Sequence, residues 1–227
     1  MKEITFPLTV FDGHLLFDYN GEIVLLDTGA PQSVYRKKKW LFDGVSYETL
    51  TTYHGLQVKE LYNYIGHPVD LILGSDILSQ YDFIIDTKKK SIKLDASPID
   101  FPGIAFPLSY YLSIPVLSCR LNGLPVEAFL DTGAKLSYAD PECVAGVKRS
   151  GEAWDFYPML GRFKTHIYKI SFETGPIIAN MAFGILPDII RFTFEMTRIK
   201  NIIGTEIFHT HSVCFSMKNN IVAFHPF

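Results

Sequence analysis

Two short stretches decide the fold of this chain: IVLLDTGA at residues 23–30 and EAFLDTGA at residues 127–134. Each is a run of apolar residues that stops at Asp-Thr-Gly, a pattern typical of a β-strand that enters a tight turn. A single Asp-Thr-Gly is an ordinary turn sequence. Two of them, at matching places in the two halves of one chain, indicate that the sequence repeats itself.

Further landmarks recur in the same order around these two stretches. They are FPL at residues 6–8 and 106–108, Asn-Gly at 20–21 and 122–123, and VDLILGSDIL at 69–78 matched by IKNIIGTEIF at 199–208. The second copy has 26 more residues between its Asp-Thr-Gly and its Ile-Gly than the first copy has. The repeat therefore predicts two related lobes that have diverged, because a solenoid would need three or more units.

The segment at residues 95–107 joins the two copies and contains three prolines. Such a composition is typical of a connecting segment, since proline interrupts regular hydrogen bonding. We therefore place the boundary near Ile99. The predicted N-terminal lobe covers residues 1–98, and the predicted C-terminal lobe, with its longer insertion, covers residues 99–227.

The composition excludes several classes of protein. The 227 residues are 48% hydrophobic and 20% charged, which favours a packed core over disorder. The net charge is -3 without a concentrated basic region, so we expect no nucleic-acid partner. No apolar stretch approaches the roughly 18–20 residues of a membrane span, and the N-terminus lacks the apolar region of a signal peptide. We therefore expect no membrane association.

The cysteines and histidines do not form a recognisable metal or disulfide pattern. Cys119, Cys143 and Cys214 are an odd number at wide spacing, so we expect a reducing, cytoplasmic location. His209 and His211 alternate as His-Thr-His, which two metal ligands could do, but no further ligand stands at suitable spacing nearby. We interpret this pair as a surface turn, and we expect neither a metal nor a cofactor.

The local patterns are mainly those of β-strands. The predicted hairpins lie at residues 83–94 and 213–224, and the predicted short helices lie at 57–64, 76–80 and 206–209. The N-terminal strand, the connecting segment and the C-terminal IVAFHPF are candidates for a sheet that both lobes share. The patterns predict an all-β fold with a few short helices.

The two Asp-Thr-Gly turns bring together groups that can activate water. If the lobes face each other about a pseudo-twofold axis, Asp27 lies beside Asp131, while Gly29 and Gly133 allow another backbone to approach closely. Two carboxylates about 3 Å apart cannot both stay ionised, so they hold one proton between them. The ionised member can take a proton from water, and the protonated member can donate to a substrate carbonyl.

The paired DTGA motifs and the stretch ILGSDIL…YDFIIDTKKKSIKL at residues 72–94 resemble the retropepsin-like aspartic proteases of the pepsin clan. Viral members supply one Asp-Thr-Gly per subunit, so this chain resembles two such lobes fused in tandem. The resemblance implies a bilobal, pseudo-twofold, all-β fold of the double-psi closed-barrel type. It implies an aspartic endopeptidase acting on a polypeptide substrate, with no obligatory dimer for catalysis.

The resemblance also implies roles for single residues. The implied catalytic residues are Asp27, Asp131, Thr28 and Thr132, with the two threonines bonding across the lobes. The implied substrate-binding residues are Gly29, Ala30, Gly133, Ala134, Tyr157, Leu160 and Gly161. The psi-shaped loops would place Leu73-Gly74 and Ile203-Gly204 beside the catalytic turns, although both copies lack the arginine that viral relatives have after this glycine. Apolar pockets on both sides of the carboxyl pair would set the specificity.

The family covers its cleft with a β-hairpin flap. Residues 155–163 of the second lobe fit this element, with a Pro-x-x-Gly turn at 158–161. The corresponding stretch of the first lobe, at 53–55, is short and runs into a predicted helix, so we expect one working flap, on the C-terminal lobe. Alanine follows each Asp-Thr-Gly, at Ala30 and Ala134, where many acid-active members have a serine that favours the ionised carboxylate. We therefore expect an activity optimum nearer neutral pH than pH 3.

Two alternatives remain open from the sequence. The first is a non-catalytic peptide-binding module that uses the same cleft, because a first-lobe flap is missing or the two carboxyls are misaligned. The second is a regulated or self-processing protease that acts on one partner protein. A separation of about 3 Å between the carboxylates favours catalysis, whereas one above roughly 6 Å favours binding alone.

Overall fold

Most of this chain is arranged in β-strands, joined by a few short helices. The structure, a computed structural model, describes residues 3–195 and 197–227. The strands of the first half are β1 (Ile4–Phe11), β2 (His14–Tyr19), β3 (Glu22–Leu26), β4 (Val34–Tyr35), β5 (Lys39–Phe42), β6 (Val45–Glu48), β7 (Leu71–Leu73), β8 (Asp82–Asp86) and β9 (Ser91–Asp95). Its helices are η1 (Val58–Leu61), α1 (Tyr62–Ile65) and α2 (Ser75–Leu78).

The second half repeats this order and adds a long hairpin. Its strands are β10 (Ile104–Tyr111), β11 (Ile114–Leu121), β12 (Leu124–Leu130), β13 (Ser137–Tyr138), β14 (Arg149–Tyr157), β15 (Gly161–Thr174), β16 (Ile177–Gly184), β17 (Asn201–Ile203), β18 (His211–Ser216) and β19 (Ile221–Pro226). Its helices are η2 (Pro141–Val144), α3 (Asp188–Glu195), η3 (Thr205–His209) and η4 (Met217–Asn219).

The same strand arrangement surrounds the Asp-Thr-Gly turn in both halves. β3 runs parallel to β7, with Leu26 opposite Leu73, and β12 runs parallel to β17, with Leu130 opposite Ile203. β7 also pairs antiparallel with β4, and β17 with β13. These short apolar runs are buried on both faces, as the central strands of a covered sheet are. β3 also pairs with β2, and β12 with β11. Each Asp-Thr-Gly therefore follows a strand that has a hydrogen-bonded neighbour on both sides.

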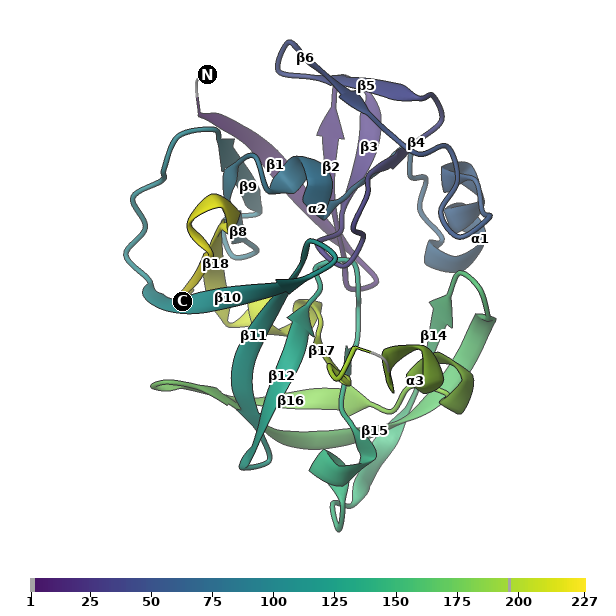
Figure 1. Cartoon of the computed structure of the whole chain (residues 1–227), viewed down its shortest axis with the longest axis vertical. Helices are drawn as coiled ribbons and strands as arrows, with labels where there is room; N and C mark the ends of the chain where they lie inside the picture. Colours follow the sequence, from purple (N-terminus) through teal and green to yellow (C-terminus); the bar gives the residue numbers. More distant parts are fainter. Residues whose placement is uncertain (1–2, 196) are drawn as a thin grey trace.

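One antiparallel sheet joins the two halves. Its strands follow the order β1, β9, β8, β18, β19 and β10, and within this sheet the two halves meet at the pair β8–β18 (Figure 1). The N-terminal strand and the C-terminal IVAFHPF are both part of this sheet, as the sequence predicts. Residues 96–103 of the predicted connecting segment contain no strand, and β10 begins at Ile104.

The apolar core runs through both halves without interruption. Phe83 of β8 and Phe215 of β18 are fully buried, and their rings stack with centroids 4.6 Å apart. Burying a side chain of this size contributes about 1.5–3 kcal/mol, and an aromatic pair adds about 0.5–1.5 kcal/mol. The joining sheet therefore anchors one half to the other with apolar contacts as well as backbone hydrogen bonds.

The predicted hairpins and short helices are present, with small shifts at their ends. The helix predicted at residues 57–64 is a 3-10 turn followed by a single α-turn, and it ends at Gly66, whose φ of 78° is left-handed. The helix predicted at 206–209 is the 3-10 helix η3. Strand β16 and helix α3, in the longer insertion of the second half, have no counterpart in our sequence analysis. No helix in the described part of the chain combines the length and the apolar character that crossing a membrane requires.

Candidate active site

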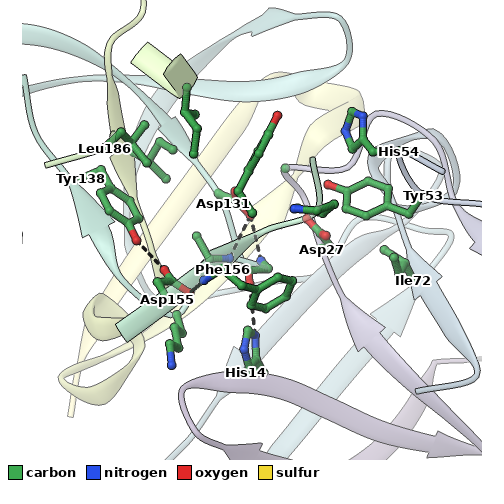
Figure 2. Close-up of a pocket in the computed structure, with 18 of the residues that line it drawn as sticks. His14, Asp27, Tyr53, His54, Ile72, Asp131, Tyr138, Asp155, Phe156 and Leu186 are labelled. Carbon is green, nitrogen blue, oxygen red and sulfur yellow. Dashed lines mark hydrogen bonds between the residues drawn. The ribbon is translucent and has the colours of Figure 1, made fainter. Parts of the chain in front are cut away.

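The two predicted catalytic aspartates lie together between the halves of the molecule. Asp27 directly follows β3, and its backbone N–H donates to the carbonyl oxygen of Leu73 at 3.0 Å. Asp131 directly follows β12, and its N–H donates to the carbonyl oxygen of Ile203 at 2.9 Å. The carboxyl groups of Asp27 and Asp131 lie beside each other and line the same cavity (Figure 2). The strands β7 and β17 thus hold the two turns face to face.

Thr28 and Thr132 cross-link these turns through four hydrogen bonds. The backbone N–H of Thr28 donates to Thr132 Oγ1 at 2.9 Å, and the N–H of Thr132 donates to Thr28 Oγ1 at 3.0 Å. Each hydroxyl then donates to a carbonyl of the opposite half: Thr28 to Leu130 at 2.6 Å and Thr132 to Leu26 at 3.0 Å. Both threonines are fully buried, so no water replaces these partners. The network fixes the spacing of the two carboxyl groups.

Glycine is required after each threonine because the opposite carboxyl lies against it. A Cβ atom at Gly29 would overlap the carboxyl group of Asp131, and a Cβ atom at Gly133 would overlap that of Asp27. Neither glycine has a positive φ. Their need for glycine therefore comes from this close approach and not from backbone conformation.

The surroundings of the two carboxyls favour a single shared proton. Burial raises the pKa of both groups, and the negative charge of Asp131 raises the pKa of Asp27 further. Asp131 Oδ1 accepts the N–H groups of Gly133 at 2.8 Å and Ala134 at 3.2 Å, whereas Asp27 Oδ1 accepts that of Ala30 at 2.9 Å. Because burial and the charge of Asp131 together hold the pKa of Asp27 well above its ordinary value, Asp27 is the member of the pair that is more readily protonated.

A cavity of about 300 Å³ opens over this pair. Its apolar lining comes from both halves and includes Leu25 and Ile72 of the first half and Ile114 and Ile202 of the second. The tyrosines that line it include Tyr53 of the first half and Tyr157 of the second half. Burial raises the pKa of both phenols, and the nearby carboxyl charges raise it further. A ligand in this cavity would therefore contact the aspartates, apolar side chains and two phenolic hydroxyls.

The predicted flap is the tip of the β14–β15 hairpin. Tyr157 and Pro158 line the cavity, and Arg162 Nη2 donates to the carbonyl oxygen of Asn63 in the first half at 2.7 Å. This hydrogen bond joins the tip of the hairpin to the first half, so the hairpin spans the cleft. The corresponding stretch of the first half forms only a tight turn, in which Tyr53 and Leu56 pair as an isolated antiparallel bridge. The β5–β6 hairpin of that half lies earlier in the chain.

The remaining predicted substrate-binding residues divide into two groups. Gly29, Gly133 and Ala134 line the cavity beside the carboxyl pair. Ala30 is fully buried and packs in a small apolar cluster of the first half, so its side chain does not face the cavity. Leu160 and Gly161 lie at the end of the hairpin and are not among the residues that line the cavity.

The cavity lining also contains polar residues that were not predicted from the sequence as site residues, including His14, Lys135, Tyr138 and Asp155. His14 begins β2, is 3% exposed, and its Nδ1 lies 3.2 Å from the carbonyl oxygen of Gly133. Since a carbonyl oxygen only accepts, Nδ1–H is the donor. Tyr138 donates its hydroxyl to Asp155 at 2.5 Å. The sequence did contain an indication of His14. The repeat aligns it with Ile114 at the start of β11, so a polar residue stands where the other half has an apolar one.

The residues considered as metal ligands take other roles. His211 is buried in β18 and bonds to Thr210, so the interpretation of His-Thr-His as a surface turn is wrong for this residue. His209 is the last residue of η3 and His211 is the first residue of β18, so the two histidines belong to different elements. Within the described residues, no group of three or more His, Cys, Asp or Glu side chains is arranged to hold a metal ion.

Comparison with known proteins bears on the fold alone. No family model and no curated protein matches this chain in sequence. The crystal structure of basic 7S globulin from soybean is similar with a TM-score of 0.52 at 10% identity, over 99% of this chain and 95% of that one. The similarity therefore extends over both halves of a mostly β molecule.

Proposed function

We propose that this chain is an aspartic endopeptidase built from two retropepsin-like lobes, with a bilobal double-psi fold. The observation that carries the proposal is that the carboxyls of Asp27, which is buried, and Asp131, which is partly buried, lie beside each other under a largely apolar cavity. The parallel pairs β3–β7 and β12–β17, each with a further antiparallel neighbour, support the fold assignment. Both carboxyls belong to one chain, so a second copy is not needed to complete the site.

The reaction follows from the proton distribution in the pair. Asp131 is the ionised member and accepts a proton from a water molecule held between the carboxyls, so that this water attacks the peptide carbonyl. Asp27 is the protonated member and donates to the carbonyl oxygen as the tetrahedral intermediate forms. The aspartates then return the proton to the leaving nitrogen, and no covalent intermediate with the protein is formed.

The cavity favours an extended polypeptide as the substrate. Strand β14 ends at Tyr157 above the carboxyl pair, and its backbone can pair with an added strand, as in other β-augmentation complexes. The apolar walls would receive side chains that alternate along such a strand. The proposed reaction is therefore cleavage within a peptide and not removal of a terminal residue.

A peptide library tests the proposal against a binding module. We expect the wild-type chain to cleave a subset of peptides internally, and a statine-type mimic of the tetrahedral intermediate to inhibit this cleavage. Mass spectrometry of the products identifies the bonds that are cut. Binding of peptides without any cleavage, by protein whose fold is verified by circular dichroism, would instead establish the non-catalytic module.

The pH profile gives a second test of the carboxyl pair. Burial raises the pKa of both aspartates, so the singly protonated form persists to higher pH than two free aspartates would allow. We expect the profile of kcat/KM to peak nearer neutral pH than pH 3. A hydroxyl at position 134 would donate to ionised Asp131 and lower its pKa. Ala134→Ser should thus move the acidic limb down by about one pH unit, the equivalent of one charge-assisted hydrogen bond.

The control for this substitution is Ala145→Ser, which adds the same hydroxyl at an exposed position outside the cavity. Ala145→Ser should leave the profile unchanged. An optimum near pH 3 in the wild type would contradict the raised pKa values. An unchanged acidic limb in Ala134→Ser would contradict the placement of this residue beside Asp131.

A further inference from the structure

The repeat makes positions 14 and 114 equivalent, but the cavity lining is polar at one of them and apolar at the other. His14 begins β2 and Ile114 begins β11, and both side chains line the cavity. Beside His14 the lining contains further polar groups, which we call the polar wall: His14, Lys135, Tyr138 and Asp155. Figure 2 shows Tyr138, Asp155 and His14 on one side of the carboxyl pair and Tyr53, His54 and Ile72 on the other. The expectation of apolar pockets on both sides therefore does not describe this side of the cleft.

Asp155 is the member of the polar wall whose charge is left without a counter-ion. Its Oδ2 accepts the Tyr138 hydroxyl, and its Oδ1 accepts the backbone N–H of Phe156 at 2.8 Å. The nearby cation, Lys135, forms its ion pair with Asp12 instead, at 2.8 Å. Among the described residues, no cationic side chain lies within ion-pair distance of Asp155. Each oxygen of this carboxylate nevertheless keeps a second lone pair that can accept a hydrogen bond.

The other groups of the polar wall add no positive charge to balance Asp155. His14 is neutral, because burial and the charge of Lys135 lower its pKa to about 4. Its Nδ1–H donates to the carbonyl oxygen of Gly133, so its Nε2 carries no proton and can accept a hydrogen bond. Asp12 and Lys135 offset one another, so Asp155, whose pKa is raised by burial, is the remaining acidic group on this side of the cavity. Such a surface attracts a donor that carries a positive charge and repels an acidic side chain.

We propose that the polar wall is a subsite for a lysine or arginine side chain of the substrate, and that Asp155 determines this specificity. The inference rests on the proposed function, since it names the substrate class of the same cleft. The long apolar stem of the basic side chain would lie along Phe156, and its charged end would reach Asp155. Because the equivalent position on the other side carries Ile114, a basic residue would be recognised on one side of the scissile bond only. The two ends of a pseudo-symmetric cleft would thereby distinguish the direction of the peptide.

The test compares lysine with norleucine, which has a similar stem without the charge. Each is placed in turn at every position flanking the scissile bond of a peptide that the wild type cleaves. We expect lysine to raise kcat/KM over norleucine by about 10- to 100-fold at one position, on one side of the bond only. Asp155→Asn, which keeps an acceptor for Tyr138, should abolish this preference. Cleavage of the norleucine peptide by this variant, together with its circular dichroism spectrum, verifies that it is folded.

Glu152→Gln is the matched control, because Glu152 lies on the same strand but is exposed and paired with Lys164. This control should keep the preference for lysine. Equal cleavage of the lysine and norleucine peptides at every position, or a preference that survives in Asp155→Asn, would overturn the subsite.

Binding to Asp27→Asn, measured by fluorescence anisotropy with the same two peptides, separates this inference from the proposed function. Tighter binding of the lysine peptide without any wild-type cleavage would refute the protease and keep the subsite. Cleavage by the wild type together with equal binding of both peptides would keep the protease and refute the subsite.

Discussion

Asp27→Asn is expected to lower kcat for peptide hydrolysis by about 10²- to 10⁴-fold, the range that general acid-base catalysis contributes. Asparagine has nearly the shape of aspartate, but it cannot give its proton to the substrate carbonyl. The amide would still contact Asp131, and Ala30 N–H would still have an oxygen to donate to. The measurement is kcat on a cleaved library peptide, with KM expected to change much less.

The same variant should be at least as stable as the wild type near neutral pH. The pKa of Asp27 is raised in the folded chain, because burial and the charge of Asp131 oppose its ionisation. A raised folded pKa adds stability that is present at low pH and is lost as the pH rises through that pKa. Asparagine does not ionise, so Asp27→Asn avoids this loss. Urea unfolding at several pH values should show a gain in stability relative to the wild type that grows with pH.

Two comparisons isolate the effect of the carboxyl pair. Asp131→Asn should lose activity to a similar extent, because each aspartate has a required role in the proposed reaction. Asp100→Asn removes the same charge at an exposed position far from the cavity, and it should leave kcat unchanged. Full activity in either asparagine variant of the pair would refute the proposed mechanism.

The symmetric features of the site were predictable from the sequence, because the same motif occurs at equivalent places in both halves. The pairing of Asp27 with Asp131 followed from two identical turns at matched places. The cross-bonding of Thr28 and Thr132 was implied by the resemblance, and the structure shows these hydrogen bonds in both directions. Symmetry thus allows a contact over 104 residues to be expected without any knowledge of the intervening loops.

The asymmetric features could not be predicted, since each depends on contacts that one half alone provides. Asp155 is polar in a strand that otherwise fits a flap, and its meeting with Tyr138 depends on how β14 folds back over β13. Helix α3 lies in the longer insertion, where no repeated segment indicates its place. His14 could be placed at a strand start from the repeat, but its bond to Gly133 of the other half requires the three-dimensional arrangement.

Thr28→Val is expected to reduce the free energy of unfolding by about 2–6 kcal/mol, with a loss of activity. Valine keeps the shape of threonine but removes the hydroxyl, which leaves the N–H of Thr132 and the carbonyl of Leu130 without partners. Both groups are buried, and each unsatisfied buried group costs about 1–3 kcal/mol. Thr28→Ser retains the hydroxyl and should recover most of the stability. Urea denaturation of the three proteins measures the difference.

The double variant Thr28→Val/Thr132→Val tests whether the two threonines act as one unit. Each hydroxyl serves the backbone of the opposite turn, so the first substitution lets the turns move apart and weakens the bonds that the second would remove. We therefore expect the double variant to lose less stability than the two single losses combined, with a coupling of about 0.5–3 kcal/mol. Strict additivity would mean that the threonines stabilise their turns independently. Equal stability of Thr28→Val and the wild type would show that this network does not hold the halves together.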